Sequence, residues 1–306
     1  MYDVIIIGGG PAGLTAGLYT SRARLKSLLI EKGFIGGQVM TTEWIENYPG
    51  FEDGISGAEL SQKMEKQAVK FGLEIMQGSV TGVSVDGKTK KVALEDGTQY
   101  EAKSIILATG SNPRPLRIKG EEEFRGRGVS YCATCDGAFF RDSDLAVIGG
   151  GDSAVEEGIF LTRFAKTVHI VHRRDRLRAT KVVQERAFAN PKMKMVLDSV
   201  PEEIVGDATG VTALKIKNLK TGEVSELKVQ GVFIYIGYNP NIDPVKGIIT
   251  INESNYAVAD ENMATTQNGI FVAGDVRAKL LKQIATAVGD GATAAISAEK
   301  YIEENF

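Results

Sequence analysis

The chain has 306 residues, 43% of them hydrophobic, and this length suffices for two domains because single hydrophobic cores rarely grow beyond about 250 residues. Its formal net charge of −3 argues against a protein that binds nucleic acid by neutralising phosphates. No stretch reaches the roughly 18 uncharged apolar residues of a membrane-spanning helix, so we expect no membrane insertion.

The first module has the pattern of a strand, a glycine-rich turn, a helix and a second strand. The apolar residues Val4–Ile7 predict the first strand, and the turn Gly8–Gly13 precedes a helix that runs to about Arg24. A second apolar strand, Ser27–Ile30, ends on Glu31. This order is typical of a βαβ unit with a parallel sheet. Because the chain enters the first strand at once, we expect no signal peptide and a cytoplasmic protein.

The turn has the spacing G-x-G-x-x-G, which binds dinucleotides in many proteins but also occurs as a purely structural turn. Here the turn follows a strand and opens a helix, and its last glycine, Gly13, precedes the acidic residue Glu31 by 18 positions. The tight turn, the access of a pyrophosphate to the helix N-terminus, and close helix packing each require a glycine. Glu31 can accept hydrogen bonds from the ribose of an adenosine. The residues of this predicted site are Gly8, Gly10, Pro11, Ala12, Gly13 and Glu31.

The first module continues with a helix and several strands. Ser56, followed by Glu59, predicts the start of a helix that runs to Gly72. Alternating residues over 74–100 predict a β-meander, and the apolar run 104–108 predicts a return to a buried strand.

Residues 111–115 contain two prolines and are predicted to form a linker, after which the first pattern begins again. The second module has a strand over 144–148, a glycine turn, a helix over 152–164, and a strand over 167–171. A hairpin with its turn at Lys220–Gly222 follows. The module closes with a strand over 231–236.

The second glycine motif has a different binding preference. Gly149, Gly151 and Ala154 repeat the fingerprint, but the strand that follows ends in arginines. Guanidinium groups can chelate a 2′-phosphate, whereas an acid there would repel it, so this site is predicted to prefer NADPH. The alternative is a solvated basic helix face. The arginines concerned are Arg173, Arg174 and Arg178.

The carboxyl-terminal part contains a second linker at 237–241, a strand over 269–273, the pair Gly274-Asp275, and a helix over about 283–303. Two dinucleotide sites of different character indicate a flavin and a nicotinamide, and Asp275 is expected near the ribityl chain of FAD. We therefore predict an α/β fold of two Rossmann-like, three-layer ββα domains, one inserted in the other. The boundaries are 1–113 and 241–306 for the FAD domain and 114–240 for the NADPH domain.

The chain has only two cysteines, which form the motif Cys132-Ala133-Thr134-Cys135. A zinc site would need two more ligands, yet His169 and His172 point to opposite faces of a strand. Two inert buried cysteines are a second alternative. The spacing favours a reversible disulfide, and Asp136 is the best candidate for the proton donor to a leaving thiolate.

These motifs, in this order, resemble bacterial-type, low-molecular-weight thioredoxin reductases over the whole chain. The resemblance rests on Cys132–Gly137, the two glycine motifs and the arginine run. It also rests on Gly36-Gly37-Gln38, Glu46–Gly50, Ala108-Thr109-Gly110 and Gly274-Asp275. It implies a homodimeric flavoenzyme that passes electrons from NADPH through FAD and the disulfide to thioredoxin. In that scheme Cys132 attacks the partner protein, Cys135 lies against the flavin, and Asp136 is the acid.

The resemblance also extends both cofactor sites. For FAD it adds Lys32, Gly36, Gly37, Gln38, Asn47, Val80, Ala108, Thr109, Gly110, Gly274, Lys282, Gln283 and Ile284. Lys282 departs from the arginine that the family often has, and it loses the planar fork of a guanidinium. For NADPH the resemblance adds Asp152, Ser153, His172, Ile236 and Gly237.

Related flavoproteins are the nearest alternatives. Ferredoxin-linked flavin thioredoxin reductases lack the arginine cluster, and ferredoxin–NADP reductases of this type lack the C-x-x-C motif. The peroxide-reductase flavoprotein carries a thioredoxin-like extension. A dithiol oxidase that uses oxygen and a non-catalytic flavin redox sensor remain as other functions. The sequence does not distinguish thioredoxin from a thioredoxin-like partner.

Overall fold

The computed structural model describes residues 1–42 and 44–306, which form two compact units. The first combines Met1–Asn112 with Asn239–Phe306 and is called the outer unit. The second, Pro113–Tyr238, is called the inserted unit. Within the described residues, no helix combines the length and apolarity that crossing a bilayer requires.

The outer unit is built on a parallel sheet of strand order β3-β2-β1-β6, with β17 paired to the other side of β6. The first part of the long strand β6 pairs antiparallel with β5, which pairs with β4. The elements before the insertion are β1 (Tyr2–Ile7), α1 (Pro11–Arg22), β2 (Ser27–Glu31), a 3-10 helix (Gly37–Thr41), α2 (Gly57–Lys70), β3 (Glu74–Gln77), β4 (Val80–Asp86), β5 (Thr89–Leu94) and β6 (Gln99–Leu107). After it come a 3-10 helix (Asp243–Val245), β17 (Ile270–Val272), a 3-10 helix (Gly274–Val276) and α6 (Ile284–Asn305).

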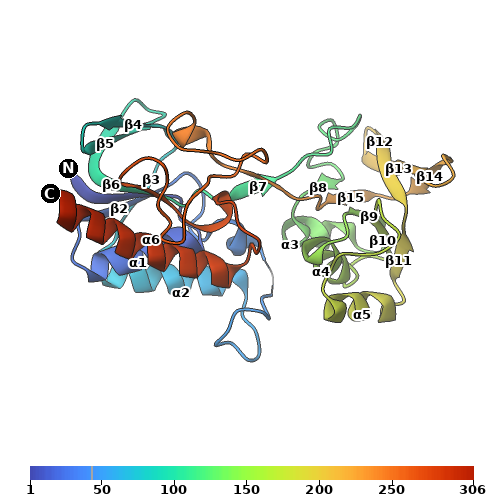
Figure 1. Cartoon of the computed structure of the whole chain (residues 1–306). Helices are drawn as coiled ribbons and strands as arrows, with labels where there is room; N and C mark the ends of the chain where they lie inside the picture. Colours follow the sequence, from blue (N-terminus) through green and yellow to red (C-terminus); the bar gives the residue numbers. More distant parts are fainter. Residues whose placement is uncertain (43) are drawn as a thin grey trace. The chain divides into compact units, whose positions relative to one another are not determined.

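Alternation along β1 explains the three layers of this unit. Val4 and Ile6 pack with apolar residues of α1, α2 and α6, which lie together on one face of the sheet (Figure 1). Ile5 and Ile7 point to the other face and pack with residues of β4 and β5, such as Val92. Because side chains of a strand alternate between faces, a strand that is apolar at every position must be covered on both.

The inserted unit repeats this arrangement with a parallel sheet of order β11-β10-β9-β15-β8. Helices α4 and α5 pack on one face through Val155 and Val183, and the antiparallel sheet β12-β13-β14 covers the other through Leu214 and Ile216. The elements are β8 (Val129–Ser130), α3 (Ala133–Asp136), a 3-10 helix (Gly137–Phe140), β9 (Asp144–Ile148), α4 (Asp152–Leu161), β10 (Thr167–Val171), α5 (Lys181–Ala189), β11 (Met193–Val196), β12 (Ser199–Asp207), β13 (Gly210–Asn218), β14 (Val224–Lys228) and β15 (Gly231–Ile234).

The two connections between the units contain short strands that the sequence did not indicate. β7 (Ser111–Pro113) and β16 (Tyr238–Pro240) pair as a two-stranded sheet. Pro113 cannot donate a backbone hydrogen bond, but it stands at the end of its strand, where this loss is tolerated.

Several predicted boundaries shift in the structure. The helix expected over 152–164 ends at Leu161, because the following residues form a turn in which the backbone N–H of Phe164 donates to the Leu161 carbonyl. The expected meander over 74–100 begins later, at β4, since β3 pairs in parallel with β2 instead. The predicted N-cap at Ser56 is confirmed: its side chain accepts a hydrogen bond of 3.1 Å from the Glu59 backbone.

Candidate functional site

Gly8 and Gly13 are required by the packing of the protein itself. Gly8 has a φ of +109°, and a Cβ built on it would lie 2.4 Å from the Ala108 carbonyl oxygen. A Cβ on Gly13 would lie 1.9 Å from the Gly8 carbonyl oxygen. These contacts bring the turn, the start of α1 and the predicted site residue Ala108 together. No larger residue fits at either glycine without moving the backbone.

Gly10 differs from both, because the space beside it is open. A Cβ there would find its nearest neighbour, the Gly36 carbonyl oxygen, at 4.0 Å. Gly10 is also the N-cap of α1 and provides no side-chain cap, and Pro11 follows it as the first helical residue. An uncapped helix N-terminus that faces open space can receive the phosphates of a dinucleotide. Packing among the described residues does not require a glycine at this position, and the open space fits a ligand.

The carboxylate of Glu31 lies at the end of β2, where the turn Gly8–Gly13 meets the following loop. Its Oε2 accepts a hydrogen bond of 2.6 Å from the Gly9 backbone, and its Oε1 accepts one of 2.8 Å from the Gly33 backbone. The Gly36 backbone N–H donates to the Gly9 carbonyl at 2.8 Å. A carboxylate has about four acceptor positions, so two remain for ribose hydroxyls.

Asp275 supplies a second acceptor in the outer unit. Gly274, before it, has a φ of +81° and packs so closely on α1 that a Cβ would lie 2.9 Å from Ala12 Cβ. The Oδ1 atom of Asp275 is buried and has no hydrogen-bond partner among the described residues. Burial raises the pKa of Asp275, and the nearby ammonium groups of Lys279 and Lys282 oppose that shift. A buried acceptor without a donor fits the hydroxyl-rich ribityl chain of FAD.

The start of α6 brings three more predicted residues together. Asn47 donates from its side-chain amide to Gln283 Oε1 at 3.1 Å. Gln283 is the N-cap of α6 and forms a capping box with Thr286. Lys282 Nζ donates to the backbone carbonyls of Asp275 at 2.9 Å and Arg277 at 3.2 Å. In place of a planar guanidinium, Lys282 thus stabilises the loop that carries Asp275.

The remaining predicted FAD residues lie around these loops or apart from them. Gly37 approaches Gly10, since a Cβ on it would lie 3.3 Å from Gly10 Cα, and it starts the 3-10 helix that also contains Gln38. The Thr109 hydroxyl, next to Gly110, donates to the Asn241 carbonyl at 2.6 Å. Lys32 is exposed after β2, whereas Val80 and Ile284 are half-buried and pack against separate apolar clusters.

The second glycine turn repeats the contrast of the first. Gly149 has a φ of +148°, and a Cβ on it would lie 2.3 Å from the Tyr235 carbonyl oxygen. At Gly151, the N-cap of α4, a Cβ would meet none of the described residues within 4 Å apart from its chain neighbours. Ala154 is buried in the core behind this turn, while Ser153 is exposed. The open position is again the glycine at the helix N-terminus, which fits a bound pyrophosphate.

His172 and the arginines are tied to this turn. The His172 ring packs so closely on Gly150 that a Cβ there would lie 2.5 Å from Nδ1, and its buried Nε2 has no hydrogen-bond partner among the described residues. Burial lowers the pKa of His172, and the Arg178, Arg174 and Arg173 charges lower it further. The Arg178 backbone donates to the Gly150 carbonyl at 2.6 Å.

All three arginine side chains of this site are exposed, and Asp152 helps to hold their loop because its Oδ1 accepts a 2.7 Å hydrogen bond from the Thr180 backbone. The last predicted NADPH residues follow β15: Ile236 is half-buried and Gly237 is exposed. Three exposed arginine side chains of one loop thus accompany a helix N-terminus without a side-chain cap, a combination that suits a phosphorylated dinucleotide.

Cys132 and Cys135 form a disulfide at the two ends of the short helix α3. The Cys135 backbone N–H lies 3.2 Å from Cys132 Sγ and donates to it. Such a bond strengthens when the acceptor is a thiolate, so it favours the ionised form of Cys132 after reduction. Cys135 is exposed and Cys132 and Asp136 are half-buried.

The residues that hold this motif could not be predicted from the sequence. The Tyr235 hydroxyl accepts a 2.8 Å hydrogen bond from the Ala133 backbone, and burial raises the pKa of this tyrosine. Ser130 Oγ accepts from the Cys132 backbone at 3.0 Å. Tyr235 lies 102 residues from Ala133 along the chain, so no local pattern connects them.

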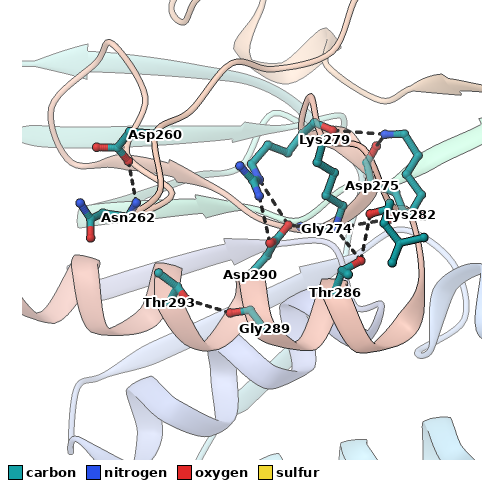
Figure 2. Close-up of polar contacts among 12 residues, drawn as sticks. Asp260, Asn262, Gly274, Asp275, Lys279, Lys282, Thr286, Gly289, Asp290 and Thr293 are labelled. Carbon is teal, nitrogen blue, oxygen red and sulfur yellow. Dashed lines mark hydrogen bonds and ion pairs between the residues drawn. The ribbon is translucent and has the colours of Figure 1, made fainter. Parts of the chain in front are cut away.

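A charge cluster behind Asp275 was also missed. Asp290 projects from α6 towards the loop that carries Asp275 and Lys279 (Figure 2). It accepts hydrogen bonds from the Gly274 backbone and from the side chains of Arg277 and Lys279. An aspartate between two glycines of a helix gives no sequence signal of this role.

Comparisons with known proteins identify the family of the chain. The family described as Pyridine nucleotide-disulphide oxidoreductase matches residues 2–291. The "Thioredoxin reductase" of Listeria innocua is 52% identical over 99% of this chain and 95% of that protein. The "Bifunctional thioredoxin reductase/thioredoxin" of Mycobacterium leprae is 46% identical over 100% of this chain and 67% of that protein. The solved structure of Lactococcus lactis thioredoxin reductase, in its FR conformation, has a TM-score of 0.97 and 51% identity, covering 99% of this chain and 100% of that one.

Proposed function

Because the chain belongs to the thioredoxin reductases of the pyridine nucleotide-disulphide oxidoreductase family, we propose that it moves electrons from NADPH to thioredoxin through FAD and the Cys132–Cys135 disulfide. The observation that carries this proposal is the disulfide itself, which joins the only two cysteines of the chain. Its unit also contains the arginine-lined glycine turn. The outer unit contains the turn with Glu31 and Asp275.

The enzyme uses FAD and NADPH, as its family does. FAD supplies the chemistry that accepts a hydride from NADPH and releases two electrons to a disulfide. We assign FAD to the outer unit, where Gly10 leaves room for the pyrophosphate and Glu31 and Asp275 offer acceptors to hydroxyls. We assign NADPH to the inserted unit, where Gly151 leaves the equivalent room and the arginines supply positive charge.

The two cysteines have different proposed roles. Two electrons and two protons convert their disulfide to two thiols. The Cys132 thiolate then attacks the disulfide of thioredoxin, and the Cys135 thiolate displaces the reduced thioredoxin and restores the original bond. The hydrogen bond from the Cys135 backbone supports Cys132 as the attacking group. Asp136 is the proposed source of the proton that the leaving thiolate takes up.

We also propose that the enzyme works as a homodimer in the cytoplasm. The resemblance to bacterial-type thioredoxin reductases supports the dimer. The cytoplasm is a reducing compartment, in which structural disulfides are rare but catalytic cysteine pairs occur. A single C-x-x-C pair that cycles between its oxidised and reduced forms therefore supports a cytoplasmic location. The mass of the purified protein in solution tests the first proposal, and fractionation of cells tests the second.

The overall function is tested by comparing two electron acceptors. Purified protein loaded with FAD should oxidise NADPH rapidly when oxidised thioredoxin is added, and two thiols should appear on thioredoxin for each NADPH consumed. Oxygen consumption measured without thioredoxin should remain slow. Fast oxygen consumption that thioredoxin does not change would instead identify a dithiol oxidase.

Coenzyme choice is predicted to depend on the arginine loop. Arg174→Ala removes a charged donor to the 2′-phosphate, and loss of such a hydrogen bond costs about 1.5–3 kcal/mol. NADPH affinity should therefore fall about ten- to a hundredfold, while NADH affinity changes little. Arg176→Ala, an exposed arginine of the same loop outside the predicted site, is the matched control. Equal weakening of both coenzymes by Arg174→Ala would contradict the assignment.

A further inference from the structure

The charge cluster behind Asp275 consists of Arg277, Lys279 and Asp290, and it is buried. The side chains of Lys279 and Asp290 are only 7% and 9% exposed, and that of Arg277 is 16% exposed. Buried charges are costly unless they are paired and hydrogen-bonded, so each of them needs a partner in the protein.

Asp290 has more partners than its single charge requires. Its Oδ2 accepts from the Gly274 backbone at 3.0 Å and from Lys279 Nζ at 2.9 Å. Arg277 donates to both oxygens of Asp290, through Nη2 at 3.2 Å and Nε at 3.4 Å. Arg277 alone matches the charge of Asp290. The positive charge of Lys279 is therefore available to a second carboxylate.

That second carboxylate is Asp275. Lys279 Nζ lies 3.8 Å from Asp275 Oδ1, which is an ion-pair distance but too long for a hydrogen bond. Lys279 is held at this position by Asp290 and by Thr286, whose Oγ1 lies 3.3 Å away. Asp275 Oδ1 thus faces a cation and still has its lone pairs open to another donor (Figure 2).

We propose that Lys279, held by Asp290, is the buried counter-ion of Asp275 and a positioning residue for FAD. It keeps the Asp275 carboxylate ionised and in place, so that the carboxylate can accept hydrogen bonds from flavin hydroxyls. This inference rests on the proposed function, because it requires FAD to bind at Asp275.

The charges around Asp275 support this role. Burial raises the pKa of Asp275, Lys279 and Lys282 on its own loop lower it, and Asp290 on α6 raises it. The ammonium of Lys282 donates to two backbone carbonyls, whereas the ammonium of Lys279 lies at ion-pair distance, 3.8 Å, from the open oxygen. Removing Lys279 should raise the pKa of Asp275 further. If FAD binding needs the ionised Asp275 carboxylate, FAD is released as the pH falls through the pKa of Asp275. Without Lys279 this release should therefore occur at a higher pH than in the wild type.

A double-mutant cycle on the purified protein, stripped of FAD, tests the coupling between the two residues. FAD affinity is measured by titration from about pH 5 to about pH 8 in the wild type, Lys279→Met, Asp275→Asn and the double variant. We expect Lys279→Met to weaken FAD binding about tenfold at neutral pH and to move the pH of half-maximal release upward by about one unit. In the Asp275→Asn background the same substitution should change neither quantity, because the group that Lys279 serves is then neutral.

Two further variants separate this role from a general effect on folding. Lys279→Arg retains the charge and should keep the wild-type pH of release. Asp260→Asn is the matched control: this carboxylate accepts from the Asn262 and Ala264 backbones at 2.9 Å, away from the cluster (Figure 2).

Equal weakening by Lys279→Met in both backgrounds would overturn the proposal, as would a lower melting temperature with unchanged FAD affinity. Failure of the wild type to bind FAD would instead contradict the proposed function.

Discussion

Cys132→Ser and Cys135→Ser should each abolish thioredoxin reduction, yet the two variants should have different absorption spectra. Activity should disappear in both, because thiol–disulfide exchange requires one sulfur to attack and a second to resolve the mixed disulfide. Cys132→Ser leaves the Cys135 thiol, which we assign to the flavin side, and a thiolate there should give a long-wavelength charge-transfer band. Cys135→Ser should lack this band.

The measurement is an absorption spectrum of each FAD-loaded variant over a range of pH, together with steady-state reduction of thioredoxin. Thr134→Ser is the matched control, since it makes a similarly small change between the two cysteines. NADPH should still reduce the flavin in both cysteine variants. If their spectra are identical, the assignment of Cys132 to thioredoxin and Cys135 to the flavin loses its support.

Gly10→Val should give a folded but colourless protein. The valine side chain would enter the open space beside the α1 N-terminus, where the nearest contact of a Cβ among the described residues, apart from the adjacent ones, is the Gly36 carbonyl oxygen at 4.0 Å. The protein should therefore tolerate it, whereas the pyrophosphate of FAD should not. We expect FAD content to fall from about one per chain to almost none. Displacing the charged pyrophosphate from its hydrogen-bond donors should weaken FAD affinity by roughly a hundredfold or more.

Two matched substitutions make this result specific. Gly82→Val places the same side chain in β4, where a Cβ has similar room within the part of the chain that the structure describes, and it should leave the flavin bound. Gly8→Val should instead disrupt folding, because its Cβ would overlap the Ala108 carbonyl. A yellow Gly10→Val protein with full FAD content would show that the first glycine motif does not bind the flavin pyrophosphate.

The fold class could be predicted because its signals are local. Residues 4–7 of β1 are apolar at every position, α1 and α4 each follow a glycine turn, and this pattern occurs twice. The pairing of β7 with β16 could not be predicted, because each strand is short and exists only through a partner distant in the chain. The boundary at Leu161 was missed for a related reason: the turn that follows it has no glycine or proline to mark it.

The candidate site likewise combines residues with a local sequence signal and residues without one. Gly8, Gly10 and Glu31 could be identified because their spacing is set by one βαβ unit. The contacts of Asp290 with Gly274 and of Tyr235 with Ala133 arise only when elements far apart in the sequence pack together. A buried aspartate and a buried tyrosine have no characteristic spacing that would indicate a partner. The cofactor roles of the individual residues stay predictions until the variants above are measured.

The outer unit is composed of the first and last parts of the chain, and this has a consequence for its synthesis. β17 pairs with β6, and α6 packs so tightly on α1 that a Cβ on Gly291 would lie 2.2 Å from the Ala12 carbonyl oxygen. These last elements leave the ribosome only after the whole inserted unit has been made. Since domains fold as units during translation, the inserted unit can fold while the outer one still lacks Asp275 and α6. A growing chain should thus acquire its nicotinamide site before its flavin site.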